Sequence, residues 1–183
     1  MNPKNIEKAV TKLIQEIGED EAREGLKETP KRVAKAFEKI FGGYCMKAEE
    51  VMTVFDGESY DEMIICKDID FYSTCEHHMQ PFFGKVSIGY IPDKKIVGIS
   101  KLPRIVEIFS RRLQNQERLT MQIAKTLTKL LKPKGVGVVI EGKHLCMMAR
   151  GVEKQNTIMT TSYCTGLFRN DQSTRSEFLR LIK

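Results

Sequence analysis

The stretch FFGKVSIGYIPDKKIVGI, residues 82–99, indicates most clearly which fold this chain adopts. Its short apolar runs contain β-branched and aromatic residues, and Gly, Asp and Pro interrupt them, which is typical of strands joined by turns. The same pattern occurs earlier in the chain at residues 63–66 and later at residues 135–141, 144–149 and 157–163. We therefore expect two groups of strands.

Helical spacing of apolar residues frames both groups of strands. It occurs in residues 6–17, 30–41, 105–113, 119–131 and 174–182. Gly18 stands where a helix C-terminal cap belongs, and TRSE at residues 174–177 has the pattern of a capping box. Helices and strands occur in runs rather than alternating one by one, so the pattern predicts an α+β fold with a largely antiparallel sheet.

Composition excludes several classes of protein. A chain of 183 residues with 41% hydrophobic residues is long enough for one core, and its longest apolar runs fall far below the about 18 residues of a membrane span. The first residues lack a secretory signal, so we expect a cytoplasmic protein that does not bind a membrane. The net charge of +6 comes from bases interspersed with acids. A phosphorylated small molecule fits this charge as well as nucleic acid does, and we expect no nucleic acid partner.

Two short motifs contain all three histidines of the chain: CEHH at residues 75–78 and HLC at residues 144–146. A single Cys or His has an ordinary structural role more often than not, but here every His lies beside a Cys. Thiolate and imidazole are ligands that zinc favours, and three protein ligands are typical of a catalytic site. Spacing leaves the histidine partner of Cys75 open, because a turn favours His78 and a strand favours His77.

The predicted strand at residues 144–149 has one face that is unusual for a core. Side chains alternate along a strand, so one face would carry His144, Cys146, Met148 and Arg150. An imidazole, a thiol and a guanidinium in a row are costly to bury against apolar neighbours. We expect this face to form a wall of the functional site.

Two further segments carry polar side chains near the expected ends of helices. SKLPR at residues 100–104 places Lys101 and Arg104 in a first helical turn, where the helix dipole disfavours cations, so a bound anion would explain them. Solvated surface bases explain them about equally well. In QNQER at residues 114–118, Glu117 either caps a helix or accepts hydrogen bonds from a ligand, and taken alone it fits a cap better.

These motifs occur together with IGYIP, GISKLPRIV, QERLT, HLCMMARG and RSEFL, and in this order they closely resemble the GTP cyclohydrolase I family. The resemblance runs from about residue 25 to residue 182. It implies a tunnelling fold, an antiparallel sheet with helices packed on one face. It also implies an N-terminal helical region at residues 1–50, a catalytic domain at residues 51–183, and assembly into a ring-shaped homo-oligomer, usually a decamer, with sites between subunits.

The family's reaction is hydrolytic opening of the guanine ring of GTP, with release of formate and formation of 7,8-dihydroneopterin triphosphate for tetrahydrofolate or pterin biosynthesis. The resemblance assigns Zn²⁺ to Cys75, His78 and Cys146, and thereby selects His78. It implies that His144 protonates N7 as general acid and that His77 lies near the ribose.

The resemblance also implies roles for residues outside the two Cys and His motifs. Ser100 would serve in rearrangement of the ribose, and Glu117, helped by Gln116, would bind the guanine edge. The triphosphate would be held by Lys101, Arg104, Arg150, Arg32 and Lys35. Asn115 departs from the family pattern, which has an apolar residue in this motif.

Two other functions are compatible with parts of the sequence. A tunnelling-fold nitrile reductase that acts on a deazaguanine with NADPH would use a nucleophilic cysteine, and Cys75 could take that part. A structural zinc module on nucleic acid would need a fourth protein ligand and a continuous basic patch, and the sequence shows neither. The second motif, residues 144–146, completes a three-ligand zinc set and favours the cyclohydrolase.

Overall fold

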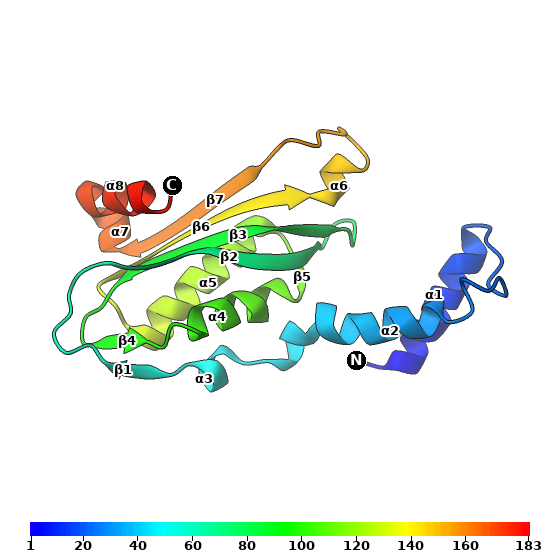
Figure 1. Cartoon of the computed structure of the whole chain (residues 1–183), viewed down its shortest axis with the longest axis horizontal. Helices are drawn as coiled ribbons and strands as arrows, with labels where there is room; N and C mark the ends of the chain where they lie inside the picture. Colours follow the sequence, from blue (N-terminus) through cyan, green and yellow to red (C-terminus); the bar gives the residue numbers. More distant parts are fainter. The chain divides into compact units, whose positions relative to one another are not determined.

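A computed structural model describes all 183 residues, as two compact units, Met1–Gly42 and Gly43–Lys183 (Figure 1). The first unit contains α1 (Pro3–Glu16) and α2 (Thr29–Ile40). The chain turns just beyond α1, as expected, at Gly18, whose φ is 87°. The sequence predicted a boundary between the helical region and the catalytic domain at residue 50, whereas the two compact units divide after Gly42. Ala48 of α3 (Ala48–Val51) belongs to the second unit, because its side chain is buried in the core of that unit.

The second unit is built on a five-stranded sheet with the order β5-β2-β3-β6-β7. Its strands are β2 (Ile64–Cys75), β3 (Pro81–Ile91), β5 (Leu113–Gln114), β6 (Gly135–His144) and β7 (Met159–Gly166). The long strands pair antiparallel, as the sequence predicts, but the short β5 pairs parallel with the end of β2. The sheet is therefore mixed. A separate two-stranded ribbon joins β1 (Val54–Asp56) to β4 (Lys95–Val97), and η1 (Gly42–Cys45) precedes α3.

Helices cover both faces of this sheet, so the expectation of helices on one face is wrong (Figure 1). On one face, α4 (Lys101–Ser110) and α5 (Gln116–Leu131) bury the main core against β2, β3 and β6. On the other face, α7 (Leu167–Asn170) and α8 (Gln172–Leu181) pack Phe168 and Phe178 against the strands. A Cβ at Gly137 would lie 2.5 Å from the Phe168 ring, so this strand glycine makes room for the second helical layer.

The prediction of a strand at residues 144–149 is wrong for every residue after His144. β6 ends at His144, and the chain then forms the helical turn α6 (Leu145–Met148). His144 pairs with Phe82, and β3 begins at Pro81, so there is no partner strand to continue the ladder. His144, Cys146, Met148 and Arg150 therefore do not share one strand face. No helix of the structure combines the length and apolar character needed to span a membrane.

The cap of the last helix also differs from the expected one. α8 begins at Gln172, and the carboxylate of Asp171, rather than Thr174, caps it by accepting from the Thr174 N–H at 2.7 Å. Hydrogen bonds from the Ser173 and Thr174 hydroxyls, together with this N–H, lower the pKa of Asp171 to about 2. The charged carboxylate is thus the form that stabilises the fold.

We expect Asp171→Ala to destabilise the protein in a manner that depends on pH. The pKa of Asp171 lies below its ordinary value of 3.8, so its stabilising effect is complete above about pH 4 and is lost as the pH falls toward about 2. Urea unfolding of the unmodified protein and of Asp171→Ala, carried out at several pH values between about 2 and 4, measures the difference in unfolding free energy. A difference that stays constant with pH would show that the charge of Asp171 does not contribute.

Candidate active site

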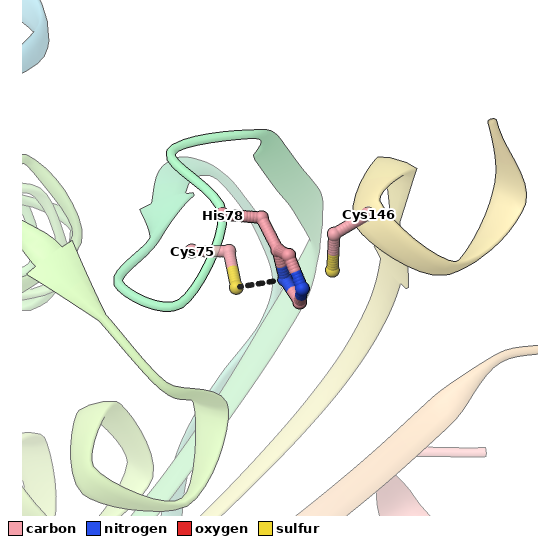
Figure 2. A group of neighbouring side chains, drawn as sticks. All are labelled: Cys75, His78 and Cys146. Carbon is pink, nitrogen blue, oxygen red and sulfur yellow. Dashed lines mark hydrogen bonds between the residues drawn. The ribbon is translucent and has the colours of Figure 1, made fainter. Parts of the chain in front are cut away.

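Cys75, His78 and Cys146 come together at one end of the sheet (Figure 2). Cys75 ends β2, His78 belongs to the turn that follows, and Cys146 lies on α6. One possible ligand atom from each residue lies within 4.8 Å of the other two. Cys75 is buried, Cys146 is half-buried and His78 is exposed, so the group opens to solvent on the histidine side.

The conformation after β2 accounts for the choice between the two neighbouring histidines. The Met79 N–H donates to the Cys75 carbonyl at 2.8 Å, and this turn brings His78, three residues after Cys75, back toward the thiols. The Nδ1 atoms of His77 and His78 both lie 3.9 Å from the Cys75 Sγ. Only the His78 ring also lies within 4.8 Å of the Cys146 thiol. The geometry therefore favours His78.

The donor set fits a zinc ion. Two thiols and one imidazole are zinc ligands, and three of them leave one coordination position free for water or substrate. Burial raises the pKa of the Cys146 thiol, and its contact with Cys75 raises this pKa further. A divalent cation bound here would favour the ionised form of the Cys146 thiol, because its positive charge stabilises a thiolate.

His144 is held next to this group by contacts on two sides. Its ring stacks on Phe82, with 4.6 Å between ring centroids and 5° between planes. Its Nε2 donates to the Gln116 side-chain oxygen at 2.8 Å. Burial lowers the pKa of His144, and the nearby Glu117 carboxylate partly opposes this shift. The hydrogen bond at Nε2 leaves Nδ1 as the ring nitrogen that can exchange a proton with a ligand.

The orientation of the Gln116 amide follows from its other contacts. Its nitrogen donates to the Met159 carbonyl at 2.8 Å and to the Ile140 carbonyl at 3.1 Å, so its oxygen must face His144. Gln116 is 1% exposed, and a Cβ at Gly142 would lie 2.4 Å from its side-chain oxygen. The sequence singled out Gln116 as a helper in base binding, whereas the structure shows its side chain holding His144.

Glu117 lies at the edge of an open pocket of about 510 Å³ between α5 and β7. The pocket is lined by Asn115, Glu117, Arg118, Thr120, Met121, Thr161, Ser162 and Tyr163. The Glu117 side chain is exposed, and its charge influences His144. A carboxylate in such a pocket can accept hydrogen bonds from two N–H groups of a planar ligand.

Comparison with known proteins identifies the family. The family model described as GTP cyclohydrolase I matches residues 6–183. The chain belongs to the GTP cyclohydrolase I family. Proteins named GTP cyclohydrolase 1 are similar to it over almost its whole length. One from Wolinella succinogenes is 55% identical over a match that covers 97% of this chain and 96% of the relative. One from Chlorobaculum tepidum is 58% identical over a match that covers 95% of this chain and 78% of the relative.

The structure brings together only some of the residues expected to form the site of this GTP cyclohydrolase I family member. Arg150 is close enough to Cys146 for its charge to favour the thiolate. Ser100, Lys101 and Arg104 lie at the start of α4. α4 extends about 15 Å from Lys101 to Ser110 before the chain reaches β5, which pairs with the end of β2 at Cys75. Ser100 and Lys101 therefore lie at the end of α4 that is far from β5.

Two expected phosphate-binding residues lie in the other compact unit. Arg32 and Lys35 are both on α2 and both exposed to solvent. Three residues at the turn after β2 have no role predicted from the sequence. Glu76 belongs to the turn itself, and Asn115 and Arg118 contact it from the start of α5. Glu76 pairs with Arg118 and accepts from the Asn115 amide at 2.8 Å. The one available signal was the departure at Asn115 from the family's apolar residue.

Proposed function

We propose that this chain is a zinc-dependent GTP cyclohydrolase I. It opens the guanine ring of GTP by hydrolysis, releases C8 as formate and yields 7,8-dihydroneopterin triphosphate, the first step of tetrahydrofolate or pterin biosynthesis. The observation that carries the proposal is the group of Cys75, His78 and Cys146 beside an oriented His144, in a chain 55% identical to a protein named GTP cyclohydrolase 1.

Cys75, His78 and Cys146 would hold Zn²⁺. When bound, zinc acts as a Lewis acid and makes hydroxide available near neutral pH, which suits attack on C8 of the guanine ring. The buried Cys75 anchors the group to the sheet, and the exposed His78 leaves the solvent side open to substrate.

His144 acts as the general acid that protonates N7. Gln116 occupies Nε2, so the proton leaves from Nδ1. Burial of the ring disfavours the imidazolium, and the Glu117 carboxylate favours it. Stacking on Phe82 restricts rotation of the ring, which keeps the proton aimed in one direction.

Glu117 selects the base. Guanine presents N1–H and a 2-amino group on one edge, and a carboxylate can accept from both, whereas adenine lacks this pair of donors. Gln116 contributes by fixing the start of α5, on which Glu117 stands. His77, which is exposed and next to His78 in the sequence, would lie near the ribose, and Ser100 would assist the ribose rearrangement.

A ring-shaped homo-oligomer of tunnelling-fold subunits completes the site. Ser100, Lys101 and Arg104 lie in the first half of α4, and the second half of α4 leads to β5 beside Cys75. A neighbouring subunit would therefore bring its Ser100, Lys101 and Arg104 to Cys75, His78 and Cys146 of this one. The triphosphate of GTP would then be bound by Lys101, Arg104, Arg150, Arg32 and Lys35. The outer strands β5 and β7 each have one unpaired edge, which is compatible with sheets joining across subunits into a decamer.

Incubation of the zinc-loaded protein with GTP tests the proposal. Formate and a product that becomes fluorescent on oxidation to the pterin should appear together, and ATP should give neither. Protein that contains stoichiometric zinc and leaves GTP unchanged would refute the proposed function.

We expect Glu117→Ala to reduce kcat/KM for GTP by at least about 100-fold, because the pocket loses the acceptor for two guanine donors. The side chain is exposed, so the unfolding temperature should change little. Steady-state kinetics and thermal unfolding of the variant measure both effects. Glu117→Gln serves as the matched variant, since it keeps the size but not the charge. Unchanged turnover in both variants would remove Glu117 from the site.

A further inference from the structure

The turn that carries His78 is tied to α5 through Glu76. One Glu76 oxygen accepts from the Asn115 amide at 2.8 Å, and the other pairs with Arg118. The Glu76 N–H also donates to the Gln114 carbonyl at 2.9 Å. The residue between Cys75 and His77 is thereby fixed by both its backbone and its side chain.

Asn115 makes two contacts at once. Its side-chain oxygen accepts from the Arg118 N–H at 2.8 Å and caps α5, which leaves its amide nitrogen to donate to Glu76. Ser, Thr or Asp would cap the helix equally well, but Asp could not donate to Glu76. An apolar residue at this position would make neither contact. The two contacts together therefore require a side chain that both accepts and donates, as the Asn115 amide does.

The position of Asn115 links two parts of the site. It precedes Gln116, which holds His144, and Glu117, which lines the pocket. Through Glu76 it also contacts the turn that presents His78. The His78 side chain is exposed and approaches Cys75 only to 3.9 Å, so its own contacts hold it weakly. Its place depends on the conformation of the turn.

We infer that Asn115 is a positioning residue for the metal site. It caps α5 and at the same time holds Glu76, and in this way it keeps His78 within reach of the two thiols. The inference rests on the proposed role of Cys75, His78 and Cys146 as zinc ligands. Residues that orient metal ligands from outside typically change metal affinity by about 10- to 100-fold when altered. We expect an effect at the lower end of this range, because Arg118 and the backbone still hold Glu76.

Two variants of Asn115 and one double variant separate this role from helix capping. Asn115→Asp keeps the cap but places a second carboxylate against Glu76. Asn115→Val removes both contacts. The double variant Asn115→Asp/Glu76→Gln reverses donor and acceptor, since the Gln amide can donate to the Asp carboxylate. Asp171→Ala is the matched control, because it removes an N-cap of the same kind from α8 on the opposite face of the sheet.

Zinc affinity, measured by competition with a chromogenic chelator, is the readout. Asn115→Asp and Asn115→Val should each bind zinc about 10-fold more weakly, the double variant should regain most of this loss, and Asp171→Ala should bind as the unmodified protein does. Equal affinity in all variants, or no recovery in the double variant, would overturn the inference.

The same measurements distinguish this inference from the proposed function. GTP turnover is assayed separately from zinc binding. Unmodified protein that binds one zinc but does not convert GTP refutes the proposed function and leaves the comparison of zinc affinities valid. Unmodified protein that binds no zinc refutes both.

Discussion

Cys75→Ser and Cys146→Ser should each lose zinc and nearly all GTP turnover. The three ligand atoms lie within 4.8 Å of one another, and a serine hydroxyl in place of one thiol leaves two strong donors. Metal analysis after dialysis, alongside formate release, measures both effects. We expect zinc to fall from about one equivalent to below about 0.1, which corresponds to loss of the three-ligand site.

Cys164→Ser is the matched control, since Cys164 is a half-buried thiol of β7 outside the metal-binding group. It should retain zinc and activity. The neighbouring histidines give a second comparison, in which His78→Ala loses zinc and His77→Ala keeps it. Stoichiometric zinc in both cysteine variants would show that the metal is held elsewhere.

His144→Ala should retain zinc and lose catalysis. The metal would still have Cys75, His78 and Cys146, whereas the proton donor to N7 would be gone. General acid catalysis is typically worth about 10²- to 10⁴-fold, and we expect kcat to fall by at least this factor. Metal content and formate release from the same preparation give the result.

Gln116→Leu helps to interpret that loss. This variant lacks the amide oxygen that accepts from His144 Nε2, so the imidazole is still present but is no longer held in one orientation. The variant should keep zinc. Its kcat should lie between those of the unmodified protein and His144→Ala. A His144→Ala protein without zinc would make His144 a metal ligand and would reopen the assignment of His78.

Patterns local to the chain predicted most of the secondary structure. The helical spacing at residues 119–131 corresponds to α5 (Gln116–Leu131), and the strand pattern at residues 82–91 corresponds to β3 (Pro81–Ile91). These predictions succeed because each element buries one side against the same core, and burial of one side imposes a period of 3.6 or 2 residues. The small β5 carries no such pattern, since two residues are too few to show a period.

The error at residues 144–149 has a different cause. The segment HLCMMA has the apolar character of a strand, but a strand also needs a neighbour to accept its hydrogen bonds. β3 begins at Pro81, opposite the residue next to His144, so the ladder stops there and α6 forms. Whether a partner strand is present at a given residue depends on the pairing register, which is a long-range property of the fold.

By itself, the sequence predicted an α+β protein with Cys and His residues of types that can bind a metal, and its motifs identified the family. Side-chain chemistry and periodicity are local properties, so they can be read without coordinates. Only the tertiary structure decided that a turn after β2 brings His78 to the thiols, that Gln116 holds His144, and that Asn115 connects the metal-binding turn to α5. Apart from that of His78 with Cys75, these contacts join residues about 30 to 70 positions apart, and their geometry depends on how the strands and helices pack.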